Sequence, residues 1–315
     1  MKKLFTLVLI VSMVIGASAS FAAGNWPSKT INVFVTHSAG GDTDYLARQL
    51  FKSVETILGQ TVVVSNVTGA NGATCMQQYR NGNADGYTFI ATNSAALLGN
   101  YATGMVDFSY DAFEPVAVYS RSAENIVVPA DAPYSTLDEL IAATQKNPGK
   151  IRLGISTGGG VYIMACVLTN IGKAQFNVID VGDGAQRLAA MLGGEVDVTS
   201  LPYETAADYI ESGKIKSLCT LLSEAPAYLP DQKPACAIIP ELVMETECVI
   251  LAPKGTPAHL TKAMNEAILK ATDTPEWKKM FKEHCFQEPF VLNLKETNAE
   301  LKKQYDLFNT FMPYL

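Results

Sequence analysis

The fold is decided by the stretch Ile31-Asn32-Val33-Phe34-Val35-Thr36-His37-Ser38-Ala39-Gly40-Gly41-Asp42-Thr43-Asp44-Tyr45-Leu46-Ala47. Its β-branched start, Ile31–Thr36, predicts a strand, and the apolar spacing from Thr43 onward predicts an amphipathic helix. Gly40 and Gly41 stand in the turn between them. A strand that passes through a short turn directly into a helix is typical of a parallel sheet covered by helices, so this stretch predicts an α/β fold.

A second stretch with the same order lies in the middle of the chain and reads Ser156-Thr157-Gly158-Gly159-Gly160-Val161-Tyr162-Ile163-Met164-Ala165. Both stretches place a serine, glycines and the start of a helix at the carboxyl end of a predicted strand. Open α/β sheets bind ligands at this edge. Two such edges, one in each half, predict two lobes that face one cleft, although Gly-rich turns of this kind also recur in α/β proteins without a ligand.

The rest of the chain alternates the same two patterns. Further strands are expected at Val62–Asn66, Thr88–Thr92, Val116–Tyr119, Ile126–Val128, Ile151–Ile155, Asn177–Val181, Val196–Ser200, Ile215–Leu221 and Cys248–Ala252. Helices are expected at Thr43–Leu58, Leu137–Gln145, Val161–Ile171, Gln186–Leu192, Glu204–Ile210, His259–Ala271 and Thr297–Phe311. A chain of 315 residues is long enough for two domains of ordinary size.

The N-terminus has the pattern of a secretory signal peptide. Lys2-Lys3 precedes an apolar run, Leu4–Ile15, and Ser20-Phe21-Ala22 fits the small-x-small rule for cleavage. The apolar run is shorter than the ~20 residues that a membrane span needs. We therefore expect residues 1–23 to be a signal peptide cleaved near Ala22 or Ala23, and the protein to act in the periplasm or another extracytoplasmic compartment.

Charge and cysteine usage exclude several classes of function. The formal net charge is −7 at pH 7, and removal of the two N-terminal lysines makes it more negative, so no nucleic-acid partner is expected. The six cysteines are scattered without a C-x-x-C pair, and with three histidines the spacing of a zinc site is absent; neither a metal nor a cofactor is expected. Cys236 and Cys248, which flank a Pro-containing loop, are the best candidates for a disulfide.

Several turns after predicted strands have the chemistry of an anion site. Free backbone N–H groups at a helix N-terminus attract negative charge, and glycines let a ligand approach the backbone closely. No arginine belongs to an obvious anion motif, so carboxylate capture is expected to rest mainly on backbone donors and hydroxyls. The candidate residues are Ser38, Gly40, Gly41, Thr43, Asn93, Ser94, Ser156, Thr157, Gly158, Gly159, Gly182, Asp183 and Gly184.

Three acids stand beside these turns and would repel a carboxylate placed against them: Asp42, Asp44 and Asp183. Asp42 and Asp44 have two interpretations. They are helix N-caps, the commoner role of aspartate at such a position, or one of them recognises an amino group or another donor on the ligand.

An enzymatic alternative comes from Gly154-Ile155-Ser156-Thr157-Gly158, which matches the G-x-S-x-G turn of serine hydrolases and lies between a predicted strand and a predicted helix. His259 or His284 would follow in the hydrolase order. Both histidines lie in charged helical stretches, however, and no H-G-G-G segment precedes the serine. A secreted α/β hydrolase using Ser156 is therefore the alternative to a non-enzymatic binding protein. His37, at the end of the first predicted strand, has two interpretations: it donates a hydrogen bond to the ligand, or it has a structural role.

A set of short motifs carries a family resemblance. In chain order they are Ala39-Gly40-Gly41-Asp42-Thr43-Asp44, Leu58-Gly59-Gln60-Thr61-Val62-Val63-Val64, Gly69-Ala70-Asn71-Gly72, Ala84-Asp85-Gly86-Tyr87-Thr88, Phe113-Glu114-Pro115-Val116-Ala117, Asn147-Pro148-Gly149-Lys150-Ile151, Leu192-Gly193-Gly194-Glu195-Val196 and Ala252-Pro253-Lys254-Gly255-Thr256-Pro257. This ordered set resembles the Bug family, the solute receptors of tripartite tricarboxylate transporters, over essentially the whole chain after the signal peptide.

The resemblance implies a two-lobed, type II-like periplasmic-binding-protein fold whose lobes are joined by two crossing strands. Residues 24–125 and 249–315 would form the first lobe and residues 126–248 the second. It implies a monomeric receptor that delivers a small organic acid to membrane transporter subunits. Carried over by position, the binding loop Ser38–Asp44 adds Ala39, Asp42 and Asp44 to the candidates, and the segment Leu201-Pro202-Tyr203 adds Tyr203.

The chain also departs from the family pattern. The family usually has Pro in place of Ala39, Gly in place of Asp42, and Tyr-Lys-Gly-Gly in place of Val181-Gly182-Asp183-Gly184. The missing lysine and the two added acids predict a ligand that is less anionic than a tricarboxylate or that carries an amine or hydroxyl. The other interpretation makes Asp183 an ordinary turn residue. A receptor that feeds a sensor instead of a transporter is a further alternative.

Overall fold

The computed structural model describes residues 26–226, 229–285 and 289–315, so the predicted signal peptide and its cleavage point lie outside the described residues. The strands are β1 (Ile31–Val35), β2 (Val62–Asn66), β3 (Thr88–Asn93), β4 (Phe113–Pro129), β5 (Arg152–Ile155), β6 (Asn177–Asp180), β7 (Thr199–Pro202), β8 (Ile215–Thr220) and β9 (Glu245–Pro253). The α-helices are α2 (Asp42–Leu58), α3 (Ala73–Tyr79), α4 (Ser94–Ala102), α5 (Leu137–Lys146), α6 (Gly160–Asn170), α7 (Gly184–Leu192), α8 (Tyr203–Glu211), α9 (Ala258–Thr272), α10 (Pro275–Met280) and α11 (Leu294–Phe311). Within these residues no helix is both long and apolar enough to cross a membrane.

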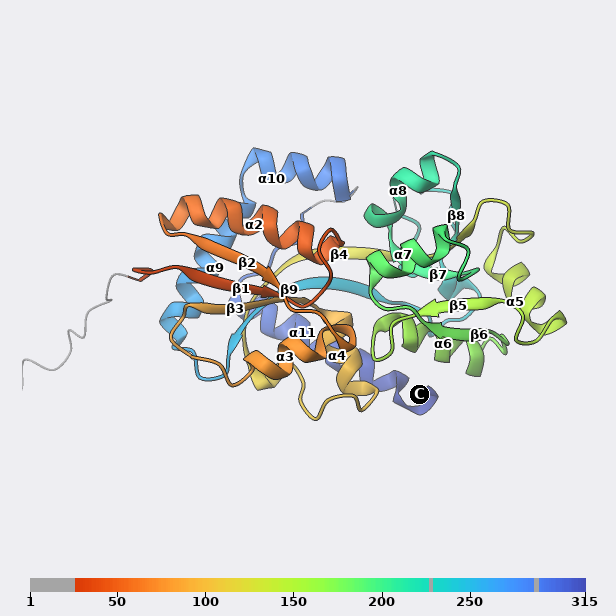
Figure 1. The fold of residues 1–315 in the computed structure, drawn as a ribbon, viewed down its shortest axis with the longest axis horizontal. Coiled ribbons are helices and arrows are strands. Elements are labelled where there is room, and N and C mark those ends of the chain that lie inside the picture. The colour runs from red at the N-terminus through yellow and green to blue at the C-terminus, as the bar shows by residue number, and fades with distance from the viewer. Residues whose placement is uncertain (1–25, 227–228, 286–288) are drawn as a thin grey trace, which may run out of the picture.

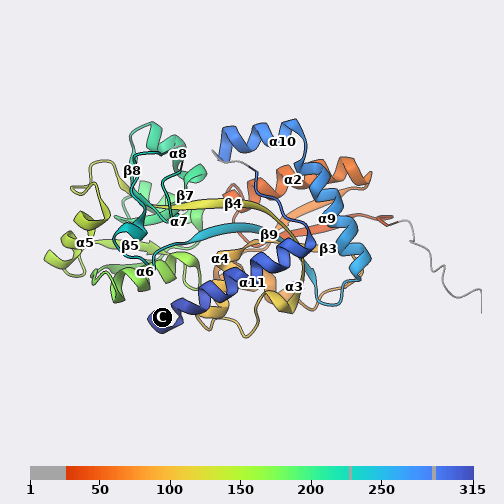
Figure 2. The same ribbon diagram turned by 180° about the vertical axis from the view of Figure 1, so that it is seen from behind.

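Two strands connect the two lobes. A seven-stranded sheet has the order β2-β1-β3-β9-β4-β7, with β8 also paired to β4, and β5 and β6 form a separate parallel pair. The first part of β4 pairs with β9, and its last part, from Glu124 to Pro129, pairs with β7 and β8. β4 and β9 therefore run side by side through the waist of the molecule (Figures 1 and 2).

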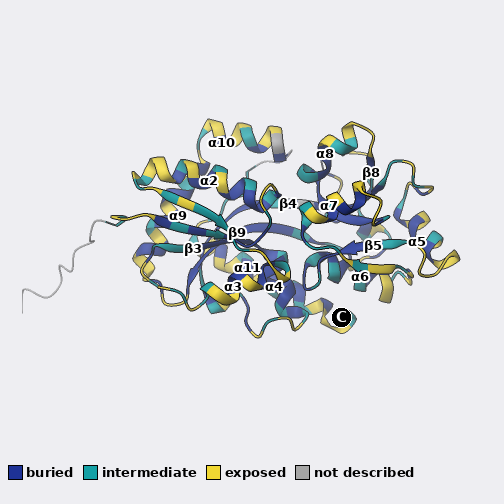
Figure 3. Cartoon of the chain, viewed as in Figure 1, coloured by how far each residue is buried: buried dark blue, intermediate teal, exposed yellow. Residues whose placement is uncertain are grey.

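The predicted two-lobed α/β fold is confirmed. In the first lobe α2, α9 and α10 cover one face of the sheet, and α3, α4 and α11 lie on the other (Figure 1). The strands at the centre are buried, whereas the outward faces of the helices are exposed (Figure 3). The lobe boundaries at residues 125 and 248 stay a prediction. β4 and β9 run through these two positions without a break. The C-terminal segment, assigned to the first lobe, also contacts the second, because the carbonyl of Tyr314 accepts a hydrogen bond from Asn170 at 2.7 Å.

Local sequence explains where α2 begins and ends. The helix is amphipathic, with Leu46, Leu50 and Val54 buried along one face. It ends at Gly59, which has φ of 64° and whose N–H bonds to the carbonyl of Glu55. This left-handed conformation suits glycine, so Leu58-Gly59 is the point where the helix stops.

Three features differ from the sequence predictions. The segments Val116–Tyr119 and Ile126–Val128, predicted as separate strands, belong to the single strand β4. Helices α3, α4 and α10 were not predicted. The predicted disulfide between Cys236 and Cys248 is wrong, because both thiols are free: Cys248 is buried within β9, and Cys236 donates hydrogen bonds to the carbonyls of Leu222 and Ser223.

Candidate functional site

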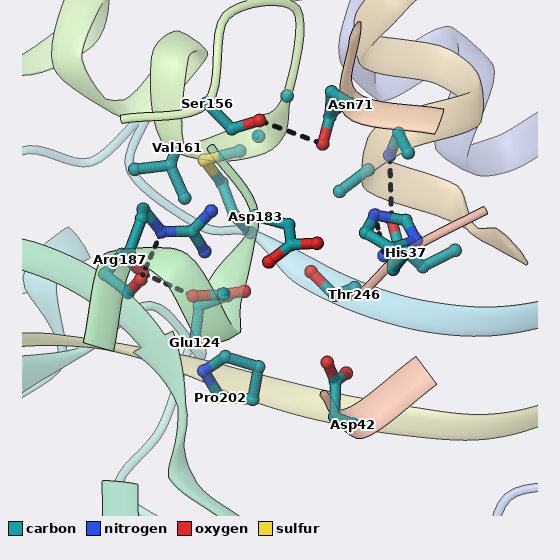
Figure 4. Close-up of a pocket in the computed structure, with 18 of the residues that line it drawn as sticks. His37, Asp42, Asn71, Glu124, Ser156, Val161, Asp183, Arg187, Pro202 and Thr246 are labelled. Carbon is teal, nitrogen blue, oxygen red and sulfur yellow. Dashed lines mark hydrogen bonds between the residues drawn. The ribbon is translucent and has the colours of Figure 1, made fainter. Parts of the chain in front are cut away.

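A cavity lies between the lobes, where the turns after several strands meet (Figure 4). The first lobe contributes the ends of β1 and β3 and the starts of α2 and α4. The second contributes the starts of α6 and α7 and the end of β7, and the crossing strands contribute Glu124 and Thr246. The carboxyl ends of strands from both lobes thus face one space, as open α/β sheets arrange their ligand sites.

The cavity brings together part of the predicted set. Its lining includes Asp42, Asn93, Ser156, Gly159, Asp183 and Gly184. An adjoining hollow is lined by Ser38, Thr157 and Gly182 together with Asp183 and Ser156. A third cavity, on the far side of Asp42, is lined by Gly40, Gly41 and Asp44.

The remaining candidates have other contacts. Ala39 is exposed, Thr43 accepts a 3.4 Å hydrogen bond from the Asn93 amide, and the Ser94 hydroxyl accepts one from the Glu247 N–H at 3.0 Å. Gly158 packs against Asn100, and Tyr203 is buried at the start of α8. These candidates are not among the residues that line the three cavities.

Four helix N-termini converge on the cavity, and they differ in charge. α2 carries Asp42 and Asp44 in its first turn, and α7 is capped by Asp183. α4 and α6 have no acid in their first turns. Asn93 caps α4 by accepting from the Ala96 N–H, whereas no side chain caps α6. These two ends without acids are adjacent, because a Cβ placed on Gly160 would lie 3.2 Å from the Cβ of Ala95. A helix N-terminus carries about half a positive charge, so an anion is favoured at α4 and α6.

Arg187 is the principal residue that the sequence predictions missed. It is 5% exposed, and its guanidinium points into the cavity (Figure 4). Its Nε and Nη1 donate to the carbonyls of Ser200 and Gly182, both at 3.2 Å, and Nη2 has no hydrogen-bond partner among the described residues. The signal in the sequence was its position: Arg187 lies four residues after Asp183, one turn into the helix that follows the predicted binding turn.

Glu124 and Asn71 were also missed. Glu124, in β4, is 9% exposed and accepts a hydrogen bond from the Ser200 hydroxyl. Asn71 lies at positive φ in the Gly69–Gly72 turn, and its Nδ2 is buried without a partner within the described part of the chain. The sequence signal for Asn71 was the Gly-Ala-Asn-Gly turn itself. Glycine and asparagine are the residues that most readily adopt positive φ, so their combination indicates a tight turn that can expose the asparagine side chain.

Electrostatics make the cavity predominantly acidic. Burial lowers the pKa of His37, against the opposing effect of Asp42 and then Asp183. Burial raises the pKa of Asp42 and of Glu124. Burial, followed by the nearby charge of Asp42, also raises the pKa of Glu204 to about 8. Such shifts are expected where carboxylates share a poorly solvated space with few cations.

Several contacts hold the lobes together across the cleft. The backbone N–H of Ser38 donates to Asp183 at 2.8 Å, and the Ser156 hydroxyl donates to Asn71 Oδ1 at 3.2 Å. Asp183 also accepts from the Gln186 N–H in a capping box. Burial alone would raise the pKa of Asp183, but the hydrogen bonds from Ser38 and Gln186 and the charge of His37 outweigh it and lower that pKa.

The three acids therefore have different roles. Asp44 binds the N–H of Gly40, Arg48 and Asn66, so it fixes the loop before α2. Asp183 caps α7 and contacts the opposite lobe. Asp42 is not an N-cap, because Gly41 holds that position, and its side chain faces the cavity (Figure 4).

The hydrolase alternative lacks a catalytic base at Ser156 among the side chains that the structure describes, which do not include His284. The Ser156 hydroxyl bonds to Asn71, and His37 bonds to Thr36 and Asn93. His259 is exposed in the first turn of α9, in the first lobe. A serine nucleophile needs a base within hydrogen-bond reach, and these contacts do not supply one.

We expect the substitution Ser156→Ala to weaken ligand binding by only about 0.5–1.5 kcal/mol, the usual contribution of one hydrogen bond. The change removes the bond to Asn71 without removing charge. Calorimetric titration measures the loss. Covalent labelling of wild-type Ser156 by a fluorophosphonate probe would contradict this role and revive the hydrolase.

Comparison with known protein families identifies the family of this chain. Residues 46–306 match the family described as "Tripartite tricarboxylate transporter family receptor". The chain belongs to this family of transport receptors. BugT of Bordetella pertussis is 28% identical over 279 residues, which cover 86% of this chain and 85% of BugT. The resemblance to the Bug family is thus confirmed, and the family is one of receptors, not of enzymes.

Solved structures share the fold of this receptor. One described as a periplasmic transporter is 25% identical with a TM-score of 0.82 and covers 90% of this chain and 96% of its own. MatC from Rhodopseudomonas palustris, solved with bound malate, is 20% identical with a TM-score of 0.80 and covers 90% of this chain and 100% of its own.

Proposed function

We propose that this receptor captures a small organic acid in the cavity between its lobes and delivers it, chemically unchanged, to membrane transporter subunits. The observation that carries the proposal is that the N-termini of α4 and α6, which have no acid in their first turns, line the same cavity as the buried guanidinium of Arg187. Backbone N–H groups and a desolvated arginine together stabilise a carboxylate. The malate in MatC supports the same class of ligand.

The proposal includes the organisation predicted from the sequence. Residues 1–23 would direct export and be cleaved off in the process, and the receptor would work as a monomer. Residues 24–125 with 249–315, and residues 126–248, would move as two bodies about β4 and β9. Of the predicted binding residues, those that line the cavity would meet the ligand, and Ser38 and Thr157 would contribute to closure around it.

The proposed function is tested by measuring ligand binding and the lobe closure that should accompany it. Calorimetric titration of the purified protein with a panel of organic acids should identify a ligand, and small-angle scattering at saturation should give a smaller radius of gyration than without ligand, because hinge closure compacts the two lobes. Unchanged scattering on demonstrated binding would argue against closure. Turnover of an ester ligand would argue against the receptor altogether.

A further inference from the structure

Asp42 differs from Asp44 and Asp183 in that the hydrogen bonds recorded for its carboxylate come from backbone N–H groups, those of Thr43 and of Asp42 itself. Asp44 binds Arg48 and Asn66, and Asp183 binds Ser38 and caps α7. In the parts of the chain that are described, no side chain forms a hydrogen bond or an ion pair with Asp42. It lines both the central cavity and the third cavity, beside Glu204. A desolvated carboxylate of this kind is unfavourable unless a donor or cation approaches it.

The described cavity lining offers no spare cation to satisfy Asp42. Arg187 is bonded to two carbonyls and has Glu124 as the first of the charges that act on it. His37 is held between Thr36 and Asn93, and burial favours its neutral form. Glu204 adds negative charge, and its Oε2 is buried without a partner among the described residues. Arg48, which lines the third cavity with Asp42, is bound to Asp44 and Asn66. A positive charge that pairs with Asp42 would therefore come from the ligand.

The two poles of the cavity are on opposite walls. Arg187 and Ser156 belong to the second lobe, with the starts of α6 and α4 nearby, whereas Asp42 lies with His37 on the wall formed by the first lobe (Figure 4). An anion is favoured on the wall with Arg187 and a cation on the wall with Asp42. A dianion would place its second carboxylate against Asp42, where like charges repel in a poorly solvated space.

We propose that the ligand is a small zwitterion, an amine-bearing carboxylic acid, whose carboxylate lies against Arg187 and the starts of α4 and α6 and whose ammonium pairs with Asp42. This inference rests on the proposed function and names the ligand class of the same site. The ammonium supplies a positively charged donor to Asp42, whose recorded donors are backbone N–H groups, and the carboxylate supplies an acceptor for Nη2 of Arg187.

Matched ligands test the inference. The wild-type protein is titrated calorimetrically with the proteinogenic amino acids, with the 2-hydroxy acids that replace each amine by a hydroxyl, and with the corresponding unsubstituted acids. We expect the best amino acid to bind at least about 30-fold more tightly than its hydroxy and unsubstituted partners, since a desolvated charge pair is lost in both.

The variant Asp42→Asn should remove this preference. It should weaken the best amino acid by roughly 30-fold and leave the hydroxy partner unchanged or improved. The matched control is Asp138→Asn, which removes an exposed first-turn acid from α5, away from the cavity, and should change no affinity.

The outcomes separate the two proposals. Tighter binding of a hydroxy or unsubstituted acid than of its amino partner would overturn the zwitterion inference and leave the organic-acid receptor standing. Equal losses for all three ligands in Asp42→Asn would also overturn it, because Asp42 would then act through structure. No binding by any member of this panel would overturn the zwitterion inference, and only a failure of the wider organic-acid panel as well would overturn the proposed function.

Discussion

The variant Arg187→Gln is expected to lose ligand binding by at least about 100-fold and to lower the free energy of unfolding by about 3 kcal/mol, a typical loss when a buried charge is removed and a nearby buried opposite charge is left uncompensated. Arg187 is 5% exposed, and Glu124, 9% exposed, is the largest of the charges that oppose the effect of burial on its pKa. Glutamine cannot reach both carbonyls that the guanidinium binds. Chemical denaturation and calorimetric titration measure the two losses.

A double variant separates the two effects. Adding Glu124→Gln to Arg187→Gln should recover most of the lost stability, because no unpaired charge is then left at this wall. The amide oxygen introduced at position 124 can still accept the hydrogen bond that the Ser200 hydroxyl donates to Glu124. Binding should not recover, since the carboxylate of the ligand still lacks its guanidinium. Recovery of binding in the double variant would show that Arg187 serves the fold alone.

Much of the architecture was accessible from the sequence because local signals and tertiary structure agree. The Ile31–Ala47 stretch folds as a strand, a glycine turn and a helix, and Gly59 ends that helix. Helix α4 was missed because it is buried on nearly all sides: Ala96, Leu97, Leu98 and Asn100 are all at most 1% exposed. Such a helix has no polar stripe, so the period that identifies a surface helix is absent.

The charges of the site were harder to predict than its loops. The glycine turns are local features, and the sequence displays them directly. Arg187 reaches the cavity only because β7 places the Ser200 carbonyl beside it, a contact between segments that are separate in sequence. The partners that distinguish Asp44 from Asp42 likewise include Asn66, at the end of β2. Burial and pairing of charged groups are tertiary properties, and residue type and spacing do not determine them.

A small residue in α4 lies where the two lobes come close together. Gly99 lies in the middle of α4, and a Cβ placed on it would be 2.6 Å from the carbonyl oxygen of Gly158 in the second lobe. Glycine is a poor residue for a helix interior, by about 1 kcal/mol relative to alanine. Its presence here is explained by the close approach of the two lobes.

The variant Gly99→Ala should therefore block closure without damaging the first lobe. The added methyl group would meet backbone atoms, which cannot rotate away, so overpacking should weaken ligand affinity by about 10- to 100-fold. The unfolding temperature without ligand should stay the same or rise, because alanine favours α4. Small-angle scattering with saturating ligand should keep the larger radius of gyration that the wild type has without ligand. Wild-type compaction and affinity in Gly99→Ala would mean that the ligand-bound lobes do not approach at Gly99 and Gly158.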